Sequence, residues 1–203
     1  MDEFAAQRFF GILALAALVG AVGLVLARLL RARLVPAEAL AESFGAHRLE
    51  AAWLVATVAT AGSLYFSEVA HYRPCDLCWA QRAFMYPLVL VLGAAVAGGH
   101  LGRGAAGHPA LGRVERWTAG AVPWLRRLVI VWVLVGCGVS IYHYLLEWFP
   151  KQLETNVCDG AVPCSAFPFR LWHFLTLPFM AGCGFLFIAS VLSLPPETRR
   201  SPS

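Results

Sequence analysis

The sequence has 203 residues, of which 59% are hydrophobic and 14% charged, and this composition excludes an ordinary soluble domain. The formal net charge of +4 comes from 16 Lys and Arg residues against 12 Asp and Glu residues. In so apolar a chain we interpret the basic surplus as a sign of membrane topology, with lipid as a partner and no nucleic acid.

Five apolar stretches predict five transmembrane helices. They cover residues 9–30, 51–65, 83–97, 128–146 and 171–194, with the second fraying into "FSEVA" and Trp79 as an alternative start of the third. Each approaches the ~20 residues that a helix needs to cross a bilayer, although the second and third are short. Their continuous apolar character differs from the alternation of barrel strands, so the expected fold class is all-α integral membrane. Pro87 and Pro178 lie inside predicted spans, and we expect each to kink its helix.

The first stretch also raises the question of a cleaved signal peptide. Its leader, "MDEFAAQR", is not basic, and the apolar run that follows is long for a signal sequence. We therefore interpret residues 9–30 as an uncleaved membrane helix.

The distribution of arginine predicts the orientation. Arginines are concentrated in the first and third connections and in the tail, which places those segments in the cytoplasm. They are Arg28, Arg31, Arg33, Arg48, Arg103, Arg113, Arg116, Arg126, Arg127, Arg199 and Arg200. The N-terminus and the second and fourth connections are then extracytoplasmic, in a multi-pass protein of the cell membrane.

Six cysteines follow this topology. Cys75 and Cys78 fall in the second connection, and Cys158 and Cys164 in the fourth, so both pairs face the oxidising side of the membrane. Cys137 and Cys183 lie within spans, each between two glycines. We expect this last pair to be inert packing residues.

The motif "PCDLCWAQR" indicates a reactive dithiol. A helix that begins around Cys75 directs free N–H groups at the sulfurs, and Arg82 follows Cys78 by one turn. Both features favour the thiolate, which is the reactive form of cysteine. The alternatives are a structural bridge with Arg82 reaching the headgroups, or a four-cysteine zinc site shared with the second pair.

The second pair lies in "NVCDGAVPCSAF", where Gly160 and Pro163 allow a tight turn. A small exposed disulfide between Cys158 and Cys164 would be open to attack by an external thiol, although a simple loop staple is the alternative. Together the pairs suggest a relay of disulfide exchange. Since no haem, flavin or iron–sulfur motif is evident, a diffusible quinone is the simplest electron acceptor.

Two titratable residues near the outer ends of spans have open interpretations. His143 either hydrogen-bonds a quinone or belongs to an interfacial belt with Tyr142, Tyr144 and Trp148. Glu68 either pairs with an arginine or is simply hydrated, and we favour hydration.

Three stretches carry a family resemblance: "SLYFSEVAHYRPCDLCWAQRAFMYPL", "YHYLLEWFP" and "VCDGAVPCSAF". They resemble the disulfide bond formation protein B (DsbB) family, on its short-looped, BdbC-like branch. The resemblance covers about residues 48–194 and implies a four-helix core there. Residues 1–47 would then be an additional transmembrane helix with a cytoplasmic linker, and 195–203 a cytoplasmic tail.

The resemblance also implies an activity: reoxidation of an extracytoplasmic thioredoxin-fold thiol oxidase (DsbA- or BdbD-like), with the electrons passed to ubiquinone or menaquinone. Cys75 and Cys78 match the quinone-proximal pair, with Cys78 meeting the quinone and Arg82 supporting that contact. Cys158 and Cys164 match the pair that accepts electrons from the partner, and by order Cys158 forms the mixed disulfide.

Some features depart from the family pattern, and rival functions remain. Gln81 stands where the better-known branch often has Glu, and the first span and the long connection over 98–127 are additional. A vitamin K epoxide reductase-like enzyme would have its loop cysteines before the Cys-x-x-Cys motif. A membrane reductant conduit would need Cys137 and Cys183 to be catalytic, and a non-catalytic scaffold would use the outer cysteines only as staples.

Overall fold

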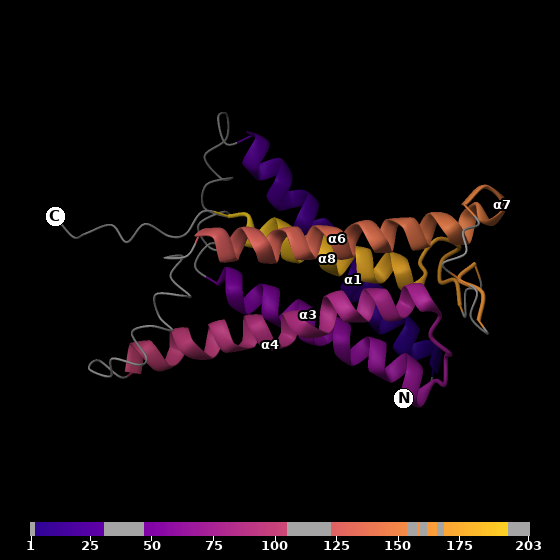
Figure 1. The fold of residues 1–203 in the computed structure, drawn as a ribbon, viewed down its shortest axis with the longest axis horizontal. Helices are drawn as coiled ribbons and strands as arrows, with labels where there is room; N and C mark the ends of the chain where they lie inside the picture. The colour runs from indigo at the N-terminus through magenta and orange to yellow at the C-terminus, as the bar shows by residue number, and fades with distance from the viewer. Residues whose placement is uncertain are drawn as a thin grey trace.

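The structure, a computed structural model, describes residues 3–30, 47–104, 123–153, 158, 162–165 and 169–194. The predicted cytoplasmic segments 31–46, 105–122 and 195–203 lie outside the described residues, and so do most of the arginines used for orientation. Within the described part, long helices run along the long axis of the molecule, with α1 crossing the others obliquely (Figure 1).

The all-α membrane fold is confirmed. The helices are α1 (Glu3–Leu30), α3 (Arg48–Leu64) with its π-helical continuation η1 (Tyr65–Val69), α4 (Asp76–Gly104), α6 (Pro123–Trp148), the short α7 (Pro150–Leu153) and α8 (Leu177–Leu192). Four of these are long and apolar enough to cross a membrane, and α8 is a shorter apolar helix. The chain is a multi-pass membrane protein.

The fifth span is shorter than predicted. The predicted segment 171–194 begins with a tight reversal, in which the backbones of Leu171 and Leu175 exchange two hydrogen bonds of 2.9 Å. Thr176 then takes an extended conformation and α8 begins at Leu177. Pro178 lies in the first turn, where its missing N–H has no intrahelical partner to lose. The kink expected at this proline was therefore wrong.

The second and third spans are longer than predicted. "FSEVA" does not fray, because residues 65–69 continue α3 as a π-helical turn. The third helix begins at Asp76, ahead of its apolar stretch and in agreement with the helix start expected around Cys75 from the motif, and it extends past residue 97 to Gly104. Cys75 directly precedes this helix, Cys78 lies in its first turn and Arg82 follows one turn later.

Helix α8 occupies the centre of the bundle. It packs against α1, α3 and α6, and its Phe185, Ile188 and Val191 are fully buried. The Phe185 ring reaches α6 at Gly136, where an added Cβ would lie only 2.7 Å from the ring. Glycine at this position therefore allows α6 and α8 to approach closely.

One end of the bundle gathers the elements that carry the predicted site. The start of α1, η1, the start of α4, the end of α6 and the start of α8 all lie there, on the right of Figure 1. We call it the cysteine end. Antiparallel packing thus brings together residues separated by about a third of the chain.

Candidate active site

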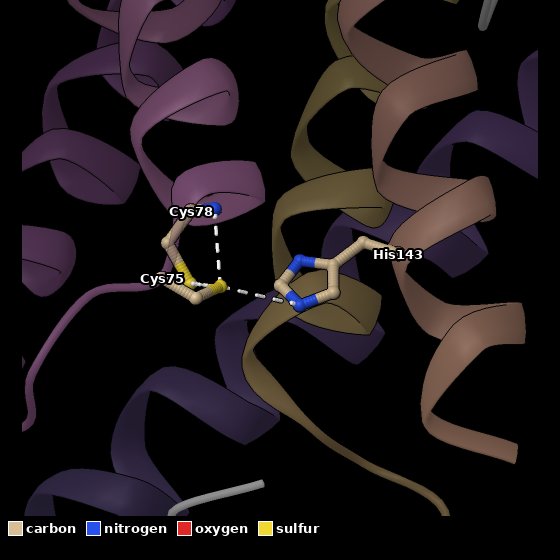
Figure 2. A group of neighbouring side chains, drawn as sticks. All are labelled: Cys75, Cys78 and His143. Atoms are coloured by element: carbon tan, nitrogen blue, oxygen red, sulfur yellow. Dashed lines mark hydrogen bonds between the residues drawn. The ribbon is translucent and has the colours of Figure 1, made fainter. Parts of the chain in front are cut away.

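Cys75 and Cys78 lie at the beginning of α4. Their Sγ atoms are 2.9 Å apart, and the backbone N–H of Cys78 donates to Cys75 Sγ at 3.4 Å (Figure 2). Both are free thiols, with Cys75 buried and Cys78 half-buried. The helix start therefore holds a close dithiol with one backbone donor directed at Cys75 Sγ.

His143 reaches this pair from α6. It is buried, and its Nε2 atom lies 3.6 Å from Cys75 Sγ and 3.1 Å from the carbonyl oxygen of Cys164. Figure 2 shows the imidazole pointing from α6 toward Cys75. The ring thus contacts both cysteine pairs and does not lie in an interfacial aromatic belt.

The hydrogen bonds of His143 determine which nitrogen carries the proton. The Cys164 carbonyl oxygen can only accept, so Nε2 must be the protonated nitrogen. In a neutral ring Nδ1 then accepts, and the amide Nε2 of Gln81, 3.2 Å away, donates to it. Gln81 therefore fixes a tautomer whose Nε2–H is directed at the Cys75 sulfur and the Cys164 carbonyl.

These contacts lower the pKa of the Cys75 thiol well below its usual range. The largest cause is the hydrogen bond from Cys78, and the contact with His143 acts in the same direction. Burial opposes both effects, since removal from water favours the neutral thiol. Cys75 is therefore the sulfur of the pair that is held as a thiolate.

The second pair is a disulfide that packs beside the first. Cys158 and Cys164 are bonded to each other, and Cys164 shares an apolar cluster with Cys75, Leu77 and Leu146. Cys164 is 1% exposed, so the expectation of an exposed disulfide was wrong for this sulfur; Cys158 is half-buried. Since two of the four sulfurs are joined, the four-cysteine zinc alternative does not fit this structure.

Arg82 is held by α3. Its Nε donates to Ser63 Oγ at 3.0 Å and its Nη2 to the Ser63 carbonyl at 3.2 Å, while the guanidinium lies 5.0 Å from the centre of the Trp79 ring. Glu68 is exposed and accepts a hydrogen bond from Ser67. Among the described residues Arg82 forms no ion pair, in agreement with the hydrated reading of Glu68.

A cavity of about 850 Å³ opens beside the dithiol. Its polar end is lined by Cys75, Cys78, Gln81, Arg82, His143 and Glu147. The rest of its wall is mostly apolar and comes mainly from α1, α3 and α8, with further residues from η1, the segment before α4, α4 itself and Val162. A cavity of this size with a few convergent polar groups is typical of a binding site for a small molecule.

Glu147 also belongs to this polar end and is a site residue that sequence reasoning missed. It is 5% exposed, and its buried Oε2 atom has no hydrogen-bond partner among the described residues. The available signal was its spacing of four residues from His143, which places both on one face of α6.

Three ligand atoms at this site also meet the basic geometry of a metal site. The Cys75 and Cys78 sulfurs and a ring nitrogen of His143 all lie within 4.8 Å of one another. A soft metal ion takes ligands of these types. The same closeness is equally what a dithiol needs in order to form a disulfide.

The two cysteines within spans lie deeper in the bundle. Cys137 is part of the main apolar cluster with Val133 and Phe185, and Cys183 is buried in α8. Cys137 precedes His143 by six residues, which corresponds to about 9 Å along a helix axis. No bond joins these cysteines to the outer pairs in the described part of the chain.

The sequence model of the family described as "Disulfide bond formation protein DsbB" matches residues 47–193. The chain belongs to the DsbB family. Disulfide bond formation protein C of Bacillus subtilis is 36% identical over 146 residues, or 72% of this chain and 90% of the relative. A probable disulfide formation protein of Deinococcus radiodurans is 36% identical over 157 residues, covering 73% and 88%. No solved structure matches this chain.

Membership in the DsbB family gives the chain a general role as a membrane oxidoreductase in disulfide formation. It favours this role over the vitamin K epoxide reductase-like, reductant-conduit and scaffold alternatives. The family match begins at residue 47, after α1 has ended at Leu30. Helix α1 is therefore additional to the matched region.

Proposed function

We propose that this protein reoxidises a thioredoxin-fold thiol oxidase (DsbA- or BdbD-like) outside the cytoplasm and passes the electrons to a membrane quinone, ubiquinone or menaquinone. The observation that carries the proposal is the meeting of both cysteine pairs at His143, at the polar end of an otherwise apolar cavity. In this arrangement the His143 imidazole contacts both Cys164, of the pair that would accept electrons from the partner, and Cys75, of the pair beside the cavity.

The electron path follows from disulfide exchange. The partner's dithiol attacks the Cys158–Cys164 disulfide, so the partner is oxidised and this pair becomes a dithiol. We assign the attacked sulfur to Cys158, because Cys164 is buried at 1% exposure while Cys158 is half-buried. The reduced loop pair then attacks a Cys75–Cys78 disulfide. This exchange restores the Cys158–Cys164 disulfide and leaves Cys75 and Cys78 as a dithiol.

The Cys75 environment favours this second exchange. Cys75 is the leaving sulfur when Cys78 is attacked, and a thiol of low pKa leaves faster. The Cys78 thiol and the Nε2–H of His143 both stabilise a negative charge on Cys75 Sγ. The Cys164 carbonyl, bonded to the same nitrogen, keeps the loop pair beside the site of exchange.

The residues around the cavity suit a quinone. Cys78, Arg82 and His143 would hold its ring at the polar end, and the apolar walls would accept its tail. A bound quinone supplies a two-electron, two-proton acceptor, so that reoxidation of the dithiol to a disulfide is balanced by formation of the quinol. Arg82 offers a positive charge in a position fixed by Ser63, and this charge would stabilise a bound quinone's oxygen as it gained negative charge.

Glu147 completes the proton path in this proposal. Oxidation of a dithiol releases two protons. In the tautomer described above His143 Nε2 already carries a proton, so the ring stabilises the Cys75 thiolate and does not accept a proton from it. Glu147 lies one helical turn from His143, and its buried Oε2 atom accepts no hydrogen bond from the described part of the chain. We assign Glu147 as the group that accepts protons released by thiol oxidation and passes them on at the cavity.

The orientation is part of the proposal. The proposed partner acts outside the cytoplasm, where disulfides persist, so the cysteine end must be extracytoplasmic. The N-terminus is then outside and the C-terminus in the cytoplasm. At the opposite end, Arg126 donates to the carbonyls of Leu192 and Ser193, and Arg48 donates to that of Leu194. These cations lie at the C-terminal end of α8, where they satisfy its last carbonyls and also agree with the positive-inside rule. The proposed division is a core over 48–194, an additional helix and linker over 1–47, and a tail over 195–203.

The redox state of the outer cysteines in intact cells tests this function. Maleimide gel shifts should show them oxidised in normal cells and reduced when quinone synthesis is blocked. Cys78→Ser should abolish oxidation of the partner, whereas Cys137→Ser and Cys183→Ser, the matched controls, should preserve it. If the outer cysteines do not respond to quinone depletion, the quinone proposal is wrong. If the controls lose activity and Cys78→Ser keeps it, the conduit is the better account.

A further inference from the structure

Helix α1 is an integral part of the bundle, although the family match leaves it out. The match begins at residue 47, after α1 has ended at Leu30. Ala21 and Leu24 of α1 nevertheless share a buried apolar cluster with Phe187 and Val191 of α8. Near the other end of α1, Gly11 lies against Leu171 and Leu175. This continuous packing excludes a helix that serves only as a loose anchor.

One face of α1 forms a wall of the cavity. The α1 residues that line it are Phe10, Leu13, Ala14, Ala16 and Ala17. Four of them follow the spacing i, i+3, i+4 and i+7, which is one face of a helix. Ile12, the residue before Leu13, is 56% exposed and does not line the cavity. The three alanines have short side chains, which leave the space beside α1 open.

The position of α1 is fixed at the cysteine end by polar contacts. Gln7 Nε2 donates to the Tyr72 hydroxyl at 2.9 Å, and that hydroxyl donates to the Glu3 carboxylate. The Phe10 ring packs against Phe66 of η1, and an added Cβ at Gly62 of α3 would meet this ring at 2.9 Å. Tyr72 lies three residues before Cys75, so these contacts connect α1 directly to the segment that leads into the dithiol.

The polar and apolar parts of the cavity lie at different depths. On α3 the lining extends from Ser63, which holds Arg82, to Leu54, a distance of about 14 Å along the helix axis. Ala17 of α1 and Val55 of α3 pack against the same α8 cluster, so they lie at similar depth. The deeper part of the α1 wall, at Ala17, therefore faces the apolar part of the cavity, while Phe10 lies nearer the polar end, against Phe66 and Gly62.

We propose that α1 binds the apolar tail of the quinone and determines which tails the enzyme accepts. This inference rests on the proposed function. An amphiphile with a polar ring and a long hydrocarbon tail matches a cavity whose polar groups are at one end and whose apolar wall extends deeper. The alanine face of α1 gives the tail room, and contacts with α3 and α8 confine it on the other sides.

Photoaffinity labelling of the full-length wild-type protein tests the contact without using activity. The probe is a quinone whose apolar tail ends in a photoreactive group, and unlabelled tailed quinone is the competitor. Cleavage by trypsin after Arg8 and Arg28 releases residues 9–28, which contain the whole α1 lining. We expect competitor-sensitive label in this peptide. Label confined to peptides of α3, α4 and α8 would overturn the inference.

A matched pair of variants tests the effect on specificity. Leu13→Trp adds bulk inside the cavity, and Ile12→Trp adds the same side chain on the lipid-facing side of the same helix. We expect Leu13→Trp to raise the KM for a tailed quinone about tenfold, since a methylene-sized misfit in an apolar pocket changes discrimination by at least about that factor. Its kcat, and its KM for a tailless quinone, should stay at the values of Ile12→Trp and wild type.

The outcomes separate this inference from the function on which it rests. Equal KM values for the two variants, with quinone reduction intact, would overturn the role of α1 and leave the function standing. A wild-type protein that neither reduces quinones nor shows competitor-sensitive label would overturn both. If Leu13→Trp fails to fold, the wild-type labelling pattern decides alone.

Discussion

Replacement of His143 by alanine tests whether the imidazole sets the acidity of Cys75. In the structure Nε2 lies 3.6 Å from Cys75 Sγ, and both groups are buried, so water screens their interaction little. A hydrogen bond to a charged group contributes about 1.5–3 kcal/mol, and one pKa unit corresponds to about 1.36 kcal/mol. His143→Ala should therefore raise the Cys75 pKa by about 1–2 units.

The assay is the pH dependence of alkylation of the reduced protein by iodoacetamide, with mass spectrometry to localise the adduct to Cys75. Because the thiolate is the reactive form and the Cys75 pKa is lowered, wild-type Cys75 should remain reactive far below the pH at which an ordinary thiol stops reacting. His143→Ala should move this profile toward higher pH. Cys78→Ala should move it further, because the Cys78 thiol is the larger cause of the lowered pKa.

Tyr144→Phe is the matched control on α6. It removes the hydrogen bond from the Tyr144 hydroxyl to the Phe174 carbonyl and leaves the Cys75 contacts in place. Its alkylation profile should coincide with that of wild type. If His143→Ala also coincides with wild type while Cys78→Ala shifts, the proposed role of the imidazole in stabilising the thiolate is wrong.

Two further predictions concern packing and the arginine of the site. Gly136→Ala should destabilise the protein by about 1–3 kcal/mol in thermal unfolding, because the new Cβ would lie 2.7 Å from a buried ring. Gly138→Ala, which has open space at the Cβ position, should have no such cost, and equal losses would refute the close contact of α6 with α8. Arg82→Lys should lose about 1–2 kcal/mol of stability through its two bonds to Ser63, and should also slow quinone-dependent thiol oxidation. Arg126→Lys loses a similar pair of bonds at the other end and should leave that rate unchanged, so an equal slowing in both variants would contradict a local role for Arg82.

Sequence reasoning located the helices more reliably than their ends. Apolar runs are sufficient to predict membrane helices, since hydrocarbon leaves the backbone no other partner than its own helix. The ends were missed where another interaction outweighs hydropathy. The reversal at Leu171–Leu175 delays the start of α8. The start of α4 at Asp76 was indicated by the Cys-x-x-Cys motif and not by the apolar run, which begins later. Pro178 was expected to kink a helix because the predicted span began at residue 171, which placed the proline in the helix interior. Since α8 begins only at Leu177, the proline lies in its first turn.

The amino-acid sequence by itself determined the membrane class, the two outer cysteine pairs and the family resemblance, because these depend on residue type and short spacings along one chain. Only the tertiary structure decided that His143, from α6, joins both pairs, that Gln81 fixes its tautomer and that Glu147 lines the same cavity. It also decided that α1 forms a wall of that cavity. Such contacts depend on which faces of distant helices meet, and helix packing sets those faces through shape and close approach, which no local pattern of residues records.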